Sequence, residues 1–220
     1  MHVLAVDTTT PRGSVAVVSE AGVLAEARVA TSEGHSRWLL LAVDALLRGL
    51  GLEASAIDAF AVTTGPGSFT GLRVGLASVQ GLALACGRPC VGVSTLDVLA
   101  LAAAGRAGAV VALMDAFRGE VYAGVYDGGG TPLRPASVGT LDEILPGLPS
   151  DASFVGDATV SQRARIAALR ADASFPEVEL FLAATLGRAG LALARAGSTV
   201  AASRLRPLYL RGADVRVPRP

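Results

Sequence analysis

Two residue types are missing from this chain of 220 residues, which contains no lysine and no asparagine. All 19 basic residues are therefore arginine. Schiff-base catalysis, lysine general bases and the P-loop all depend on a lysine amine, so the sequence excludes these three kinds of site. The formal net charge is +0, and the chain therefore lacks the positive charge that tight, unaided binding of nucleic acid requires.

Histidine and cysteine are scarce. The two histidines are His2 and His35, and a helical H-x-x-x-H metal pair beginning at His35 would need a second histidine where Leu39 stands. The two cysteines, Cys86 and Cys90, do not form a C-x-x-C pair and have no partner ligands in the sequence, so we interpret them as free thiols. The sequence therefore predicts no metal site.

Membrane and export signals are also missing from the sequence. The N-terminus has no basic region followed by a long apolar run, and no stretch offers about 18 apolar residues without a charge. We therefore expect a cytoplasmic protein with no membrane association. Hydrophobic residues make up 51% of the chain, which is enough for a substantial core.

Hydrophobic periodicity and turn residues predict the order of strands and helices. In the first half we expect strands at 2–7, 14–20, 23–29, 59–64 and 89–94, and helices at 32–51, 69–87 and 95–105. In the second half we expect strands at 109–116, 119–127, 133–138 and 152–157, and helices at 140–145, 160–170 and 179–196. Ser32 is expected to cap the first helix, and Gly51 to end it.

The second half of the chain repeats the order of the first: a strand ending in aspartate, a hairpin, then alternating helices and strands. Such repetition indicates duplication of one βββαβα unit. We therefore expect a two-lobed α/β fold of the actin/Hsp70/sugar-kinase-like (ribonuclease H-like) kind. The N-terminal lobe is expected at 1–105 and the C-terminal lobe at 106–220, with the tail at 207–220 packed as an extended arm.

The stretch TTGPGSFTGLRVG, residues 63–75, lies between a predicted strand and a predicted helix. It is not a P-loop because it has no lysine, and it is not the G-x-S-x-G elbow of a serine hydrolase because Pro66 and Thr70 stand where that motif has glycine. Glycine on both sides of the proline predicts a sharp turn, with Ser68 or Thr70 capping the helix. An anion bound at the helix N-terminus is the alternative.

The first predicted hairpin carries Asp7-Thr8-Thr9-Thr10 at the place where actin-like ATPases have a glycine-containing phosphate loop. β-branched side chains crowd the approach of a phosphate to the backbone. We therefore interpret Asp7, Thr8 and Thr9 as a vestigial nucleotide loop in which phosphate binding is weakened or lost. The DGGGT run at 127–131 lies between two hairpin strands and is interpreted as an ordinary turn.

The first two predicted helices, at 32–51 and 69–87, carry more apolar surface than one core face requires. Each has a second stripe of small and apolar residues opposite its core stripe, and a glycine inside a helix costs about 1 kcal/mol relative to alanine. We interpret these stripes as room for the helix of a partner protein, and the alternative is that the two helices pack on each other. His35 near the start of the first helix is also assigned to this surface, and the alternative is that it caps the helix or packs in the core. The predicted partner-binding residues are His35, Trp38, Ala42, Ala45, Gly71, Val74, Gly75, Ser78 and Leu82.

Five segments together resemble the TsaB family, also called YeaZ, over essentially the whole chain. The most specific is GPGSFTGLRVG at 65–75, and its family motif residues are Gly65, Pro66, Gly67, Ser68, Phe69, Thr70 and Arg73. The supporting segments are DTTTPRGSVAVV at 7–18, HSRWLLLAVDALL at 35–47, DAFRGEVYAGVY at 115–126 and RPLYLRGADV at 206–215.

The resemblance implies a non-catalytic subunit that helps to make N6-threonylcarbamoyladenosine at position 37 of tRNAs reading ANN codons. It implies a TsaD-like transferase and a TsaE-like ATPase as partners, dimerisation through the first two helices, and a homodimer when the chain is alone. ATP and threonylcarbamoyl-adenylate would be used by the partners, and tRNA would contact this chain only indirectly or weakly. The alternative is an independent small-molecule kinase or metallopeptidase of the same superfamily.

Overall fold

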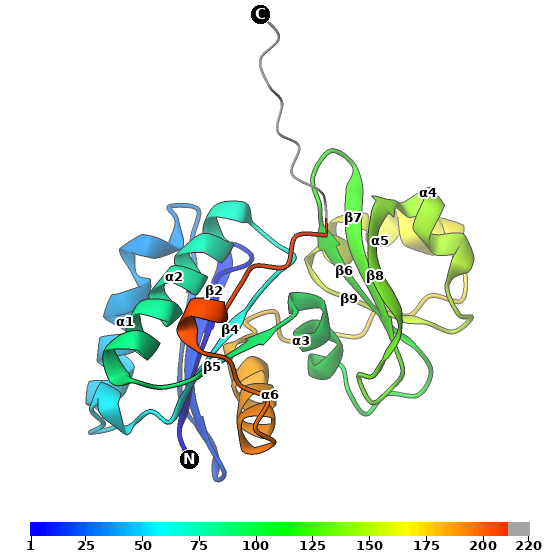
Figure 1. Ribbon diagram of the computed structural model, residues 1–220. Coiled ribbons are helices and arrows are strands. Elements are labelled where there is room, and N and C mark those ends of the chain that lie inside the picture. Colours follow the sequence, from blue (N-terminus) through cyan, green and yellow to red (C-terminus); the bar gives the residue numbers. More distant parts are fainter. Residues whose placement is uncertain (211–220) are drawn as a thin grey trace, which may run out of the picture.

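Two β-sheets form the centres of two lobes in the computed structural model, which describes residues 1–210 (Figure 1). The first sheet has the strand order β3-β2-β1-β4-β5, and the second has the order β8-β7-β6-β9. The elements before residue 105 are β1 (Val3–Asp7), β2 (Arg12–Ser19), β3 (Gly22–Ala30), η1 (His35–Arg37), α1 (Leu39–Gly49), η2 (Ala54–Ala56), β4 (Ala59–Thr63), α2 (Phe69–Cys86), β5 (Cys90–Val93) and α3 (Thr95–Ala102).

The second half of the chain begins with three strands, as the first half does. Its elements are β6 (Val110–Asp115), β7 (Glu120–Tyr126), β8 (Pro132–Thr140), α4 (Leu141–Ile144), η3 (Leu145–Gly147), β9 (Ser153–Val155), α5 (Asp157–Leu169), α6 (Ala183–Arg195) and η4 (Ala202–Arg204). In each sheet the first three strands pair antiparallel and the fourth joins in parallel beside the first. The two lobes and the repeated unit predicted from the sequence are thus confirmed.

Strand β1 lies at the centre of the first sheet, and all of its residues are buried because both faces are covered. On one face, Leu4 and Val6 pack in a cluster with α1 and α2. On the other face, Val3 and Ala5 belong to a cluster with α3 and α6. Alternate residues of a strand point to opposite faces, so a continuous apolar run is what a strand between two helical layers requires.

The predicted boundary at 105/106 is wrong, because the chain returns to the first lobe. Helix α6 packs across the first sheet, opposite α1 and α2 (Figure 1). Gly187 lies against Val18, and Gly190 lies against Ala61, so the helix backbone comes close to the sheet where a side chain would not fit. The 3₁₀ turn η4, which follows α6, also contacts this lobe because it packs on α2.

Helix α3 lies at the junction of the two lobes. It contacts β6 and β7 of the second sheet as well as α6, and its side chains share one core cluster with both sheets. The hydroxyl of Tyr126 donates a hydrogen bond of 2.7 Å to Asp97 Oδ1 on this helix. Burial, followed by the nearby Asp97 carboxylate, raises the pKa of Tyr126 and keeps the phenol in its donor form.

The start of the first helix differs from the prediction of 32–51. A turn of 3₁₀ helix precedes α1, and neither segment has a side-chain cap, so Ser32 does not cap it. The predicted end is confirmed, because Gly51 adopts a φ of +65°, which glycine tolerates best. Of the predicted arm at 207–220, the described part begins with a hydrogen bond of 2.7 Å from Leu208 N to Thr64 O, and 211–220 lie outside the described residues.

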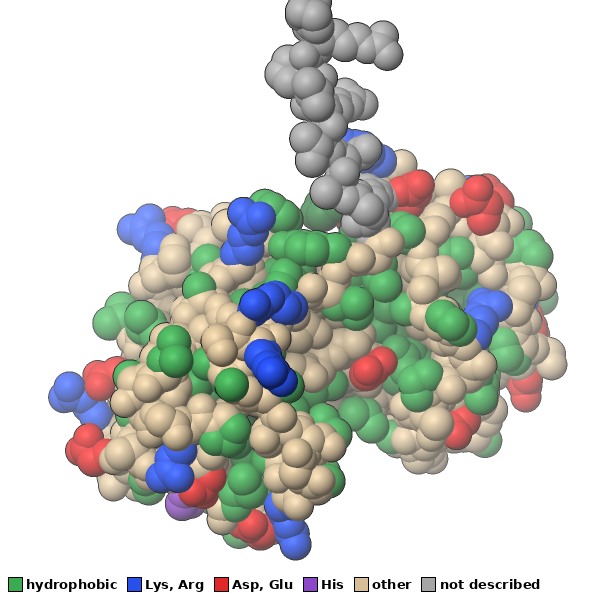
Figure 2. All heavy atoms as spheres, in the orientation of Figure 1, with side chains coloured by type: hydrophobic (Ala, Val, Ile, Leu, Met, Phe, Trp, Pro, Cys, Tyr) green, Lys and Arg blue, Asp and Glu red, His purple; other side chains and the backbone are tan. Residues whose placement is uncertain are grey.

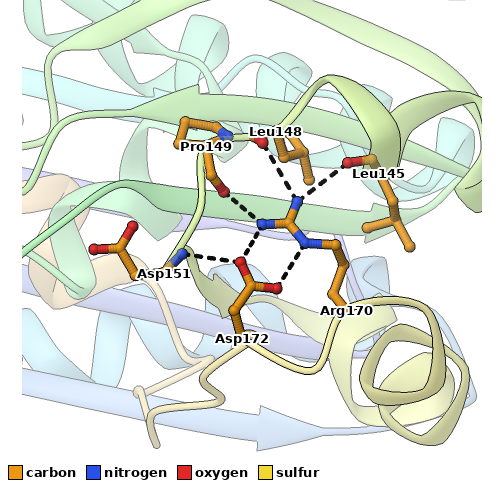
Figure 3. A network of polar contacts seen from close by, with 6 residues as sticks. All are labelled: Leu145, Leu148, Pro149, Asp151, Arg170 and Asp172. Carbon is orange, nitrogen blue, oxygen red and sulfur yellow. Dashed lines mark hydrogen bonds and ion pairs between the residues drawn. The ribbon is translucent and has the colours of Figure 1, made fainter.

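In the second lobe, the side chain of Arg170, which follows α5, connects two neighbouring segments by hydrogen bonds (Figure 3). Its guanidinium donates to Asp172 at 2.6 and 2.8 Å, and to the carbonyl oxygens of Leu145, Leu148 and Pro149. Asp172 also accepts a bond of 3.1 Å from Asp151 N. The Arg170 guanidinium and this N–H lower the pKa of the Asp172 carboxyl.

Candidate functional site

The β1–β2 loop is occupied by its own side chains. Asp7 Oδ1 accepts hydrogen bonds from Thr9 N at 3.2 Å, Thr9 Oγ1 at 2.7 Å and Thr63 Oγ1 at 2.7 Å. Its other oxygen, Oδ2, is buried and has no hydrogen-bond partner among the described residues. Burial raises the pKa of Asp7, although the three hydrogen bonds oppose this effect.

Thr8 fills the space between this loop and α2. The residue is buried, and its Oγ1 donates a hydrogen bond of 2.8 Å to Gly71 O. A phosphate loop needs backbone N–H groups that a ligand can approach. Here Thr8 lies against Gly71 and Gly75 of α2, and Thr9 lies against Gly67 of the loop before it. The vestigial nucleotide loop stays a prediction.

The motif loop joins three parts of the chain. Ser68 N donates to Thr9 O at 2.8 Å, and Ser68 Oγ accepts from Gly71 N at 3.3 Å, so the predicted helix cap is Ser68 rather than Thr70. Gly65 adopts a φ of +110°, and the Gly65–Pro66 peptide bond is cis. The predicted sharp turn is therefore confirmed, and the loop holds the β1–β2 turn against α2.

Two glycines predicted to face a partner lie instead against the same chain. Gly71 and Gly75 are buried, and a Cβ on either would overlap Thr8. Their small size lets α2 approach the β1–β2 loop, so their assignment to an outer face is wrong. Consequently, Gly75→Leu is expected to disrupt the fold rather than only an interface. Gly81 is the glycine of α2 that does face open space, with no atom within 4 Å of its ideal Cβ.

His35 was also expected to contact a partner, and the structure corrects this. The ring is 6% exposed, its Nε2 lies 2.8 Å from Thr10 O, and its Nδ1 accepts a hydrogen bond of 3.2 Å from Trp38 Nε1. Gly13 of β2 leaves room for both rings. The histidine is thus a packing residue that fixes η1 to the β1–β2 loop. No group of three or more His, Cys, Asp or Glu residues suited to a metal occurs among the described residues.

Helices α1 and α2 nevertheless leave an apolar surface uncovered. Leu41 of α1 is 71% exposed and Leu84 of α2 is 67% exposed, and both helices also carry exposed small residues. The exposed small residues are Ala45, Ala77, Gly81 and Ala85. Of the predicted partner-binding residues, Ala45 is exposed and Trp38, Ala42, Val74, Ser78 and Leu82 are half-buried, so their contact with a partner remains a prediction.

The predicted partner-binding residues do not include Leu41 or Leu84, because helical periodicity alone does not show which leucines the sheet leaves exposed. Helix α2 also has the length and apolar composition of a membrane-spanning helix, the one such helix among the described residues. Its Leu76, Val79 and Ala83 pack on the first sheet, as such residues do in a core helix of a globular protein. The apolar composition therefore reflects a helix with one face in the core and another face of small residues outside it.

Comparisons with known proteins identify the family. Residues 22–218 match the family model of TsaD, described as tRNA N6-adenosine threonylcarbamoyltransferase. YeaZ from Pseudomonas aeruginosa superposes with a TM-score of 0.79 at 32% identity, covering 95% of this chain and 99% of that chain. The chain belongs to the TsaB (YeaZ) family.

The curated relatives agree with this membership. The tRNA threonylcarbamoyladenosine biosynthesis protein TsaB of Escherichia coli is 41% identical over 57% of this chain and 55% of that protein. The match to the TsaB of Bacillus subtilis covers 60% of that protein, so this chain aligns with little more than half of the length of these relatives. A dehydratase activator from Clostridium difficile, with ADPNP bound, has a TM-score of 0.51 at 9% identity and supports the actin-like fold alone.

Proposed function

We propose that this TsaB family member is a non-catalytic subunit in the cytoplasmic synthesis of N6-threonylcarbamoyladenosine in tRNA. In this proposal, the exposed surface of α1 and α2 docks a TsaD-like transferase, and a TsaE-like ATPase joins the assembly. The observation that carries the proposal is the pair of helices that hold leucines and small residues in solvent. Exposed apolar surface of this kind is typical of protein interfaces, and small residues let two helix backbones approach closely.

The β1–β2 loop supports the non-catalytic part of the proposal. Thr8 and Thr9 occupy the place where an actin-like kinase would cradle phosphate, and the Thr8 hydroxyl is bonded to Gly71 O. The partners, rather than this chain, would then use ATP and threonylcarbamoyl-adenylate. When the chain is alone, a second copy would cover the same helices.

The test is assembly with the TsaD-like transferase of the same organism. Leu41→Arg places a charge within the proposed contact and is expected to abolish co-elution in size-exclusion chromatography. Val160→Arg is the matched control, since Val160 on α5 is 69% exposed and lies on the other lobe. The proposal fails if the Leu41 variant binds the transferase with unchanged affinity.

A second measurement tests the activity. Reconstituted modification of tRNA with the transferase, the ATPase and threonylcarbamoyl-adenylate should depend on this chain and should be lost with Leu41→Arg. Equal product with and without this chain would contradict the proposed role. ATP turnover or peptide hydrolysis by this chain alone would instead support an independent kinase or metallopeptidase.

A further inference from the structure

One edge of α2 carries exposed arginines that come from segments without acidic residues. No aspartate or glutamate occurs in residues 59–96 or 180–210, which supply α2, η4 and the segment after η4. These segments present Arg73, Arg204 and Arg206, all exposed, and none of the three is in an ion pair among the described residues. Figure 2 shows basic side chains gathered over this part of the first lobe, with no acidic side chain among them.

The three arginines lie on a surface whose shape is fixed by hydrogen bonds. Gln80 Nε2 of α2 donates to Ala202 O at 3.0 Å and to Leu205 O at 3.2 Å, which holds η4 and the following segment against the helix. Two of the three arginines, Arg73 and Arg206, line a groove of about 410 Å³. Its lining residues are Arg73, Leu76, Ala77, Gln80, Leu205, Arg206, Pro207 and Tyr209.

Two exposed aromatic rings adjoin this groove, since Tyr209 lines it and Phe69 lies beside Tyr209. Phe69 is 55% exposed and Tyr209 is 49% exposed, and their ring centroids are 6.0 Å apart. The guanidinium carbon of Arg73 lies 3.8 Å from the Phe69 ring centroid. Arginine cations beside exposed aromatic faces form the combination that binds single-stranded nucleic acid, because the cations meet phosphates and the rings stack on bases.

We infer that this surface, formed by Phe69, Arg73, Arg204, Arg206 and Tyr209, binds a single-stranded segment of RNA. The inference rests on the proposed function, under which the RNA is tRNA. The arginines contact phosphates, and an unpaired base stacks on one of the exposed rings. An acidic protein surface would also satisfy the arginines, but it gives no use to two exposed rings beside them. With a net charge of +0, the chain contributes this contact within the assembled complex rather than binding tRNA tightly by itself.

The experiment measures the affinity of an unmodified tRNA transcript for the complex of this chain with the TsaD-like transferase, by fluorescence anisotropy at several salt concentrations. The triple variant Arg73→Gln, Arg204→Gln and Arg206→Gln should weaken binding at least about tenfold. It should also reduce the slope of log affinity against log salt by about 2, since each contact to a single strand contributes about 0.7.

A matched control removes the same charge elsewhere. Arg134→Gln, Arg188→Gln and Arg195→Gln change one half-buried arginine on β8 and two exposed arginines on α6, and this triple should leave affinity and slope close to those of the wild type. Phe69→Leu with Tyr209→Leu tests stacking separately. It should weaken binding about tenfold while leaving the salt slope unchanged, because no charge is removed.

Two results would overturn the inference. In the first, both arginine triples weaken tRNA binding equally, which would reveal only a general charge effect. In the second, the triple variant at Arg73, Arg204 and Arg206 binds the transferase more weakly, while the complex that still forms binds tRNA normally. This surface would then be a contact to a protein rather than to RNA. Failure of the wild-type chain to assemble would instead overturn the proposed function, and anisotropy on the isolated chain with both triples would then decide the RNA inference.

Discussion

Alanine substitution at three glycines of α2 separates packing inside the chain from helix preference alone. A Cβ at Gly71 would overlap the carbonyl oxygen of Thr8 and lie 3.2 Å from its carbonyl carbon, and both atoms belong to the backbone. A Cβ at Gly75 would overlap Thr8 Oγ1, an atom that a side-chain rotation can move. At Gly81 no atom lies within 4 Å.

The expected free energies follow from these contacts. In a helix, alanine is favoured over glycine by about 1 kcal/mol, and Gly81→Ala should gain most of that. Gly71→Ala also overpacks a buried backbone contact, which costs about 1–3 kcal/mol, and it displaces the Thr8 hydrogen bond, worth about 1 kcal/mol. We expect a net loss of about 2 kcal/mol at Gly71 and about 1 kcal/mol at Gly75.

Urea unfolding followed by circular dichroism measures these differences, and thermal unfolding checks them. For a chain of this size, 1 kcal/mol corresponds to a shift in Tm of roughly 2–4 °C. Gly81→Ala is the matched control, being the same substitution in the same helix. If Gly71→Ala were as stable as the wild type, or if Gly81→Ala were less stable than Gly71→Ala, the assignment of these faces would be wrong.

Three further predictions concern the loop, the second lobe and nucleotide. Because burial raises the pKa of Asp7, the folded chain holds that proton more tightly than the unfolded chain, and this group's contribution to stability is lost as pH rises above about 4. The Tm of Asp7→Asn relative to that of the wild type should therefore increase as pH is raised from about 4, and a difference in Tm that does not change with pH would contradict this. Arg170→Ala should lower the free energy of unfolding in urea by about 2 kcal/mol, because carbonyls of the α4–β9 connection lose their hydrogen-bond donor. The lowered pKa of Asp172 stabilises the fold at pH values above the ordinary pKa of an aspartate, so this loss should shrink as pH falls below about 4. A loss that stayed constant with pH would exclude the Arg170–Asp172 ion pair as its cause. Isothermal calorimetry should detect no micromolar binding of ATP to the isolated chain, since Thr8 fills the space between the β1–β2 loop and α2. Micromolar affinity would refute the interpretation of this loop as a vestigial nucleotide loop.

Periodicity predicted the strands and most helices because each has its apolar residues on faces that the sheets bury. The strand ending at Asp7, the turn at Gly65 and the cap at Ser68 are local features, and local residue chemistry was enough to place them. A helical wheel gives the angles between residues but not the position of the β1–β2 loop. Thr8 is far from Gly71 in the sequence, so only the structure shows that the loop, rather than a partner, lies against those glycines.

Other contacts depended on long-range packing in the same way. The burial of His35 depends on Gly13 of a neighbouring strand, and the role of Gln80 depends on the carbonyls of Ala202 and Leu205. The return of α6 to the first sheet could not be read from the repeat, since duplication predicts similar elements but not which lobe each one covers. The exposed leucines needed the structure for the same reason.

The position of α6 sets the order in which a ribosome can complete the two lobes. The first sheet emerges early, but one of its faces waits for α6, a helix made after all strands of the second sheet. The second sheet, by contrast, is assembled from consecutive residues between 110 and 155. During synthesis the second lobe can therefore fold completely before the first lobe does. Until α6 is made, one face of the apolar strands β1 and β4 stays uncovered, and a chaperone would need to shield it.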